Sequence, residues 1–137
     1  FKKSGVSDKK DKFEIVTTVI GRVCDEEEVD EYLYPARNVY TLYVGGMGAK
    51  SKNFYYNLFC EYGYEDIADE LQNLYLSGNK KESEKMFPKE LLEELTLVGT
   101  KKDIEKKVEM WKESNVTEIS LSLPIDFETV KFIKELL

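Results

Sequence analysis

The segment GGMGAKSKN contains residue types that are suited to holding an anion. Gly45, Gly46 and Gly48 could leave backbone N–H groups free to bind a charged group. Lys50 adds a positive charge, and a helix capped by Ser51 would direct its N-terminus at the same place. These residues could hold the anionic tail of a cofactor or a charged substrate. The alternative is a plain connector, in which glycine forms the turn and the lysines are solvated.

The phrase LVGTKK offers a second glycine before a helix N-terminus, with Lys101 and Lys102 beside it. A phosphate could bind there. The competing interpretation is an ordinary helix start, because Thr100 can already satisfy one of the free backbone amides as a cap. The residues favour this second interpretation.

The composition excludes several kinds of chemistry. Histidine is absent, which removes the commonest general base and the commonest metal ligand, so catalytic triads and zinc sites are excluded. Cys24 and Cys60 stand alone and are predicted to be reduced, buried thiols. The net charge is -7, with 27 acidic and 20 basic residues, so no basic face is expected for nucleic acid. We predict no metal site and no catalytic residue, and expect any redox chemistry to come from a cofactor.

Two segments have the pattern of β-strands. Residues 14–23 are nearly continuous in Val, Ile and Thr, as in a parallel strand covered on both faces. Residues 117–123 alternate between polar and apolar types. Because two such strands do not form a complete sheet, Val19, Ile119 and Leu121 are expected to need partners that this chain lacks, as are Ile15 and Leu123.

Helices are predicted between and after these strands. A long helical stretch over about residues 25–95 begins at a capping box of Asp25 and Glu28, and Pro35 favours a break or kink in its first helix. A helix over about residues 100–114 and a last helix over about residues 126–137 complete the chain. Thr100 with Asp103, and Asp126, are the predicted caps of these two helices.

An aromatic stripe follows the glycine segment on one predicted helix: Phe54, Tyr55, Phe59 and Tyr62. Such a stripe is more often core or subunit interface than a surface for stacking a flavin. A homodimer is therefore one expected state. No apolar run reaches the length of a membrane span and no signal peptide is recognisable in the sequence, so we expect a cytoplasmic protein without membrane contact.

Several motifs occur in a fixed order: LYVGGMG followed by KNFY, then YGYEDIADELQNLYLSG, then LVGT before an amphipathic helix. This order and spacing resemble the C-terminal third of the luciferase-like oxidoreductases, especially the branch that uses a deazaflavin. The resemblance extends more weakly back to residues 14–23. It implies an α/β fold, namely the C-terminal part of a (β/α)8 TIM barrel, mostly helical and with about two parallel barrel strands.

Within that barrel the resemblance makes residues 14–23 strand seven, residues 117–123 strand eight, and residues 25–95 a helical excursion between them. The whole chain, residues 1–137, would be the C-terminal segment of one barrel domain, a fragment that lacks strands one to six. The missing N-terminal part of the barrel is then an expected partner. Because most contacts to cofactor and substrate lie on the absent strands, the chain alone is expected to be inactive.

The resemblance also implies a function. Family members transfer a hydride, or activate oxygen as monooxygenases, through a bound deazaflavin or flavin on a small organic substrate. Coenzyme F420 is the expected cofactor, and FMN is the alternative. The barrel assignment would place Gly21 and Arg22, and also Ser122 and Pro124, on the catalytic face, where Arg22 could meet an anion. Against this, an Arg at a strand end is often a surface ion pair, and the chain could instead be a non-catalytic helical interaction module.

Overall fold

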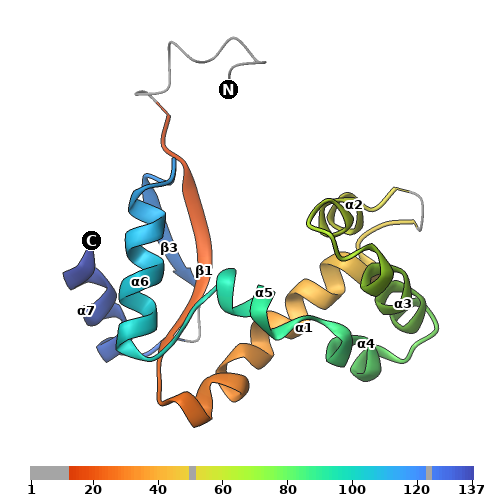
Figure 1. Ribbon diagram of the computed structural model, residues 1–137, viewed down its shortest axis with the longest axis horizontal. Helices are drawn as coiled ribbons and strands as arrows, with labels where there is room; N and C mark the ends of the chain where they lie inside the picture. Colours follow the sequence, from red (N-terminus) through yellow and green to blue (C-terminus); the bar gives the residue numbers. More distant parts are fainter. Residues whose placement is uncertain (1–12, 50–51, 123–124) are drawn as a thin grey trace.

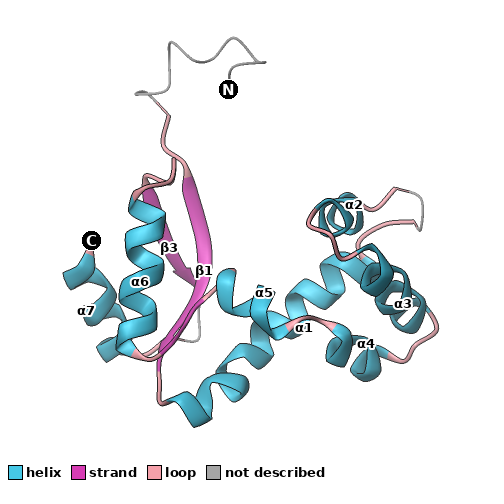
Figure 2. Cartoon of the chain, viewed as in Figure 1, coloured by secondary structure: helices cyan, strands magenta, loops and turns pink. Residues whose placement is uncertain are grey.

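The computed structural model describes residues 13–49, 52–122 and 125–137, and its centre is a small parallel β-sheet (Figure 1). The sheet has three strands in the order β2-β1-β3. Their bounds are Val16–Val23 for β1, Leu97–Gly99 for β2 and Glu118–Ser122 for β3. Helices make up most of the remaining chain (Figure 2). The expected α/β class, mostly helical and with parallel strands, is confirmed.

β1 is the central strand and pairs with a different neighbour on each side. Residues Val16–Ile20 are in register with Glu118–Ser122 of β3. Residues Gly21–Val23 are in register with Leu97–Gly99 of β2. The prediction of about two strands is therefore wrong by one. β2 was not predicted, because a strand of three residues is too short to show an alternating pattern in the sequence.

One face of the sheet is covered by two helices, α6 (Lys101–Lys112) and α7 (Phe127–Leu136). Val19 is only 4% exposed and belongs to a cluster with Ile104 and Ile133 from these helices. Ile119 and Leu121 pack against the same cluster. The expectation that these three strand residues lack partners within the chain is wrong, because α6 and α7 supply the partners. Ile15 is half-buried, and Leu123 lies outside the described residues.

The opposite face of the sheet is largely bare. Side chains alternate along a strand, so this face carries Val16, Thr18 and Ile20 from β1, and Ser120 and Ser122 from β3. Val16 is 50% exposed, and Thr18 is also exposed. On this face Ile20 of β1 and Val98 of β2 pack against apolar residues of the helical part of the chain. The described chain therefore covers one face of this strand, and cover on the second face of residues 14–23 stays a prediction.

A second core lies among the helices between β1 and β2. After a short 3-10 turn (Glu26–Glu28) come α1 (Val29–Gly46), α2 (Phe54–Glu61), α3 (Glu65–Leu76), α4 (Lys80–Met86) and α5 (Lys89–Glu94). α1 is continuous through Pro35, so the predicted break is wrong, and the kink stays a prediction. Leu33 and Ala36, both fully buried, anchor the helix on either side of the proline and offset the hydrogen bond that the proline removes.

The predicted caps near the strands are confirmed. The Asp25 N–H donates to Glu28 Oε2 at 3.1 Å, and the Thr129 N–H donates to Asp126 Oδ1 at 2.9 Å. Thr100 and Asp103 form the expected capping box of α6. The cap predicted for the helix after GGMG is wrong, because α2 begins at Phe54 and its N-cap is Asn53, which accepts hydrogen bonds from two backbone N–H groups.

The end of α1 packs closely on α3 because it carries two glycines. A Cβ atom on Gly45 would lie 2.7 Å from Tyr75 Cβ, and one on Gly46 would lie 2.5 Å from Tyr75 Cε1. Both distances are shorter than any van der Waals contact. The two glycines therefore set the distance between these helices.

We expect Gly45→Ala to lower the free energy of unfolding by about 1–2 kcal/mol, because overpacking costs more than the improved helix propensity returns. The matched control is Gly46→Ala. Its added methyl group would contact the outer edge of the Tyr75 ring, which can move, and not the Tyr75 Cβ atom, so the loss in free energy of unfolding should be smaller. Urea unfolding followed by circular dichroism measures both. A Gly46→Ala loss equal to or above that of Gly45→Ala would show that the contact of Gly45 with Tyr75 Cβ is not the tighter constraint.

Candidate functional site

The three parallel strands end at a common edge of the sheet, and the side chains beyond them form the candidate site. Arg22 lies near the end of β1, Gly99 ends β2 and Ser122 ends β3. In α/β proteins with parallel sheets, ligands bind outside the carboxyl ends of the strands. The structure thus places Arg22 at the edge where a site is expected.

Arg22 is held by residues from two helices. Its Nη1 donates to Asp126 Oδ2, at the start of α7, at 2.9 Å. Its Nη2 donates to the Tyr32 hydroxyl, on α1, at 3.2 Å, and the guanidinium carbon lies 4.5 Å from the centre of the Tyr32 ring. The Nε atom is buried and has no hydrogen-bond partner. The structure therefore supports the ion-pair interpretation of Arg22, with one donor still unused.

Asp126 connects this cluster to the backbone of β1. It accepts hydrogen bonds from the hydroxyl and the backbone N–H of Thr129, and the Thr129 hydroxyl in turn accepts from the Val23 N–H at 2.9 Å. The Thr129 hydroxyl most of all, with the Thr129 N–H and the charge of Arg22, holds the pKa of Asp126 below its usual value, against the opposing effect of partial burial. Asp126 is therefore ionised at neutral pH and balances the charge of Arg22.

The glycine segment lies far from Arg22. Tyr32, which contacts Arg22, and Gly45 are thirteen residues apart on α1, which corresponds to roughly 20 Å of helix. Gly45 and Gly46 belong to the last turn of that helix, where backbone N–H groups donate within the helix. Gly48 has a φ of +138° and packs on Asn53, and Lys50 lies outside the described residues. Packing thus accounts for the glycines of α1, and a cofactor contact from this segment stays a prediction.

The start of α6 is filled by its own cap. Gly99 has a φ of +147° and accepts a hydrogen bond from the Cys24 N–H at 3.0 Å. Thr100 and Asp103 bond to each other across the first turn, and the Lys101 amine lies 5.3 Å from the ring centre of Phe132. A phosphate would have to displace these contacts.

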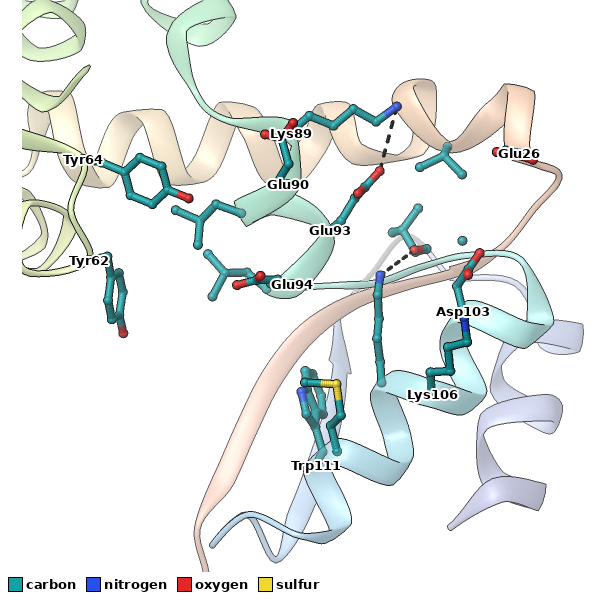
Figure 3. Close-up of a pocket in the computed structure, with 17 residues that line it drawn as sticks. Glu26, Tyr62, Tyr64, Lys89, Glu90, Glu93, Glu94, Asp103, Lys106 and Trp111 are labelled. Atoms are coloured by element: carbon teal, nitrogen blue, oxygen red, sulfur yellow. Dashed lines mark hydrogen bonds and ion pairs between the residues drawn. The ribbon is translucent and has the colours of Figure 1, made fainter. Parts of the chain in front are cut away.

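An open groove of about 1020 Å³ lies between α5 and α6 and was not foreseen from the sequence (Figure 3). Tyr62, Tyr64 and Trp111 line it together with several charged side chains. Lys107 lies in its wall and donates to the Val98 carbonyl at 3.0 Å, and burial lowers the pKa of its amine. The lining residues come from segments that are far apart in the chain, among them the turn between α2 and α3, α5, β2 and α6, and a sequence pattern does not reveal such a grouping.

The two cysteines are free, with Cys24 buried and Cys60 half-buried, and burial raises the pKa of the Cys24 thiol. Over the described parts of the chain, no three His, Cys, Asp or Glu side chains gather in a way that could hold a metal ion. Within the same residues no helix combines the length and the apolar character needed to cross a bilayer.

Comparison with known proteins gives one informative relative. No family model matches the chain. Among curated proteins, the chain is 29% identical over 117 residues to a protein of Mycobacterium tuberculosis named "Putative coenzyme F420-dependent oxidoreductase". The match covers 85% of this chain but only 33% of the relative. The chain therefore spans about a third of the length of the curated relative that it matches.

We expect Asp126→Asn to weaken the acid sensitivity of the fold. A carboxylate whose pKa is lowered by folding stabilises the native state above its unfolded pKa of about 4, and this contribution disappears as the pH falls through the lower folded pKa. Asparagine keeps an oxygen that can cap α7 but does not titrate. The parent should therefore lose free energy of unfolding more steeply than Asp126→Asn as the pH falls below about 4.

Urea unfolding at several pH values measures this difference. Asp126→Ala is the companion variant. It also removes the cap, and should be less stable than Asp126→Asn by about 1 kcal/mol near neutral pH. An identical acid dependence in the parent and Asp126→Asn would show that the Asp126 cluster does not respond to protonation as described.

Proposed function

We propose that this chain is the C-terminal part of a (β/α)8 barrel oxidoreductase of the luciferase-like family. The complete enzyme would transfer a hydride between coenzyme F420 and a small organic substrate. The observation that carries this proposal is the similarity over 85% of the chain to a relative whose name gives both the enzyme class and the cofactor. FMN, with activation of oxygen in a monooxygenase reaction, is the alternative chemistry within the same family.

The sheet fits the proposed position in a barrel. β1 and β3 are parallel and adjacent, as strands seven and eight of a barrel are. In such a barrel the helices form an outer ring, and the inner face of each strand meets the other strands. Here α6 and α7 cover one face of the sheet, while the face that carries Val16 and Thr18 is exposed within the described chain. The missing strands would cover that face.

The residues at the carboxyl edge of the sheet fit one side of a site for an anionic cofactor. Arg22 has an unused Nε donor, and Ser122 supplies a hydroxyl at the neighbouring strand end. Because Asp126 already balances its charge, Arg22 could bind an anionic group only by giving up part of that pairing. When bound, the cofactor would supply the hydride chemistry, and Arg22, held by Asp126 and Tyr32, would position it. The other contacts would have to come from the missing strands.

Gly45, Gly46, Gly48 and Lys50 remain a second proposed contact. Since they lie roughly 20 Å along α1 from the Arg22 cluster, they could contact only a distant part of the same cofactor or the substrate. The alternative of a non-catalytic helical module has less support, because it explains neither the bare sheet face nor the name of the relative.

The test is a titration of the proposed complete enzyme, a longer protein that would contain this chain, with coenzyme F420 and, separately, with FMN, followed by cofactor fluorescence. We expect saturable binding of coenzyme F420, and no binding by the 137-residue chain alone. Arg22→Gln should weaken binding by about tenfold, because a charge-assisted hydrogen bond is lost. No spectral change with either cofactor would rule out the proposed enzyme.

The matched control is Arg37→Gln. Arg37 is the second arginine and pairs with Asp30 at 3.0 Å on the helical side of the molecule. It should leave cofactor affinity unchanged. An equal loss of affinity in both variants would indicate general destabilisation and would remove Arg22 from the site.

A further inference from the structure

The groove between α5 and α6 has apolar walls that solvent reaches. Met110 on α6 is 67% exposed, and Tyr62, in the turn after α2, is 59% exposed. Trp111 is half-buried, with its inner side against the cluster that contains Val19. In Figure 3, Trp111 and Tyr62 lie across the groove from each other, with β1 passing beside Trp111. The groove is lined by Val98 and Gly99 of β2, and its Trp111 packs on the cluster that contains Val19 of β1.

On the β2 side of the sheet, part of the edge of β1 has no strand partner among the described residues. β2 pairs with β1 only over Gly21–Val23. On that side of β1, residues Val16–Ile20 have no strand partner within the described parts of the chain. Backbone N–H and C=O groups on such an edge are a template for a further strand.

The handedness of crossover connections predicts where a helix that connects such a strand to β1 would lie. Connections between parallel strands share one hand in almost all proteins. α6 connects β2 to β3 and so crosses the sheet from the β2 side toward the β3 side. A connection from a strand beside Val16–Ile20 into β1 would run in the same direction. Its helix would therefore lie on the face that α6 covers, next to α6, at the groove.

Charge indicates the character of the occupant. Five acidic side chains and three lysines line the groove. Lys89 lies 3.9 Å from Glu93, and Lys107 is bound to the Val98 carbonyl. Glu90 and Glu94 show no ion pair among the described residues. The rim of the groove is therefore acidic and complements basic side chains.

We propose that the groove is the docking site for an amphipathic α-helix with an apolar stripe and basic flanks, which follows a strand paired with Val16–Ile20 and connects that strand to β1. The inference rests on the proposed function in one respect, because it takes this helix and strand from the part of the barrel that the chain lacks. It adds which face they bind and which charges they carry.

The experiment uses Trp111, the single tryptophan of the chain, as the reporter. The 137-residue chain is titrated with a synthetic helical peptide that carries Leu and Ile on one face and Lys and Arg on both flanks. We expect saturable binding with a blue shift of the Trp111 emission. A peptide with the same apolar face and glutamate flanks should bind at least about tenfold more weakly, because it meets like charges. Equal binding of the two peptides would overturn the proposal.

Variants locate the site. Glu90→Lys with Glu94→Lys should weaken the basic peptide by about tenfold or more. The matched control is Glu105→Lys with Glu128→Lys, which makes the same change of charge at exposed positions outside the groove and should retain most of the binding. If the two double variants weaken binding equally, the attraction is nonspecific and the groove is not the site.

A second copy of the chain is the competing occupant. Analytical ultracentrifugation should find a monomer. A dimer that Met110→Lys dissociates, in a chain that binds no peptide, would assign the groove to self-association and overturn the proposal.

The outcome is separable from that of the proposed function. In the longer protein, with any additional tryptophans replaced by phenylalanine, acrylamide should quench Trp111 much less than in the 137-residue chain. Equal quenching in a protein that binds coenzyme F420 would overturn the docking proposal alone. Shielded Trp111 in a protein that binds neither cofactor would overturn the function alone.

Discussion

The parallel pairing of β1 with two neighbours is the constraint on which the rest of the structure depends. It joins segments that are about a hundred residues apart in the chain, Val16–Ile20 with Glu118–Ser122, and aligns the ends of all three strands at one edge. That alignment brings Arg22 within reach of Asp126. Among the described residues it also leaves the outer edge of β3, and the edge of β1 beside Val16–Ile20, without a strand partner. A stable sheet has to satisfy the backbone groups on such edges with further strands or with water.

Arg22 also lies between the two cores of the molecule and forms hydrogen bonds on both sides. One core lies between the sheet, α6 and α7, and the other among the helices around α1 and α3. The guanidinium group contacts Asp126 on the first side and Tyr32 on the second. Replacing Arg22 would therefore disturb the placement of α1 relative to the sheet as well as the charge at the sheet edge. A control arginine is needed for this reason in any binding experiment.

Local signals in the sequence predicted local structure well. The capping boxes at Asp25 and Thr100 and the cap at Asp126 are confirmed, because each depends only on residues within one helical turn. The break at Pro35 was wrong because tertiary packing around Leu33 and Ala36 outweighs one lost hydrogen bond. β2 was missed because its three residues become a strand only through pairing with β1.

The candidate site was less predictable for the same physical reason. From the sequence, Gly45 and Gly46 were predicted to form either an anion-binding loop or a plain connector. Only the position of Tyr75 shows that they form a close contact between helices. In the aromatic stripe, Phe59 is 3% exposed whereas Phe54 is 68% exposed, a division that depends on how α2 is oriented. The groove depends on the relative positions of α5 and α6, and the sequences of these two helices do not determine those positions.

The most direct test of the account is amide hydrogen exchange at the open edges of the sheet. It compares the 137-residue chain with the longer protein, at residues Val16–Ile20 and Glu118–Ser122. If the sheet is part of a closed barrel, amides that point away from their present partner should exchange at least about tenfold more slowly in the longer protein. Equal exchange in both proteins would show that no strand is added at these edges, and would contradict the barrel.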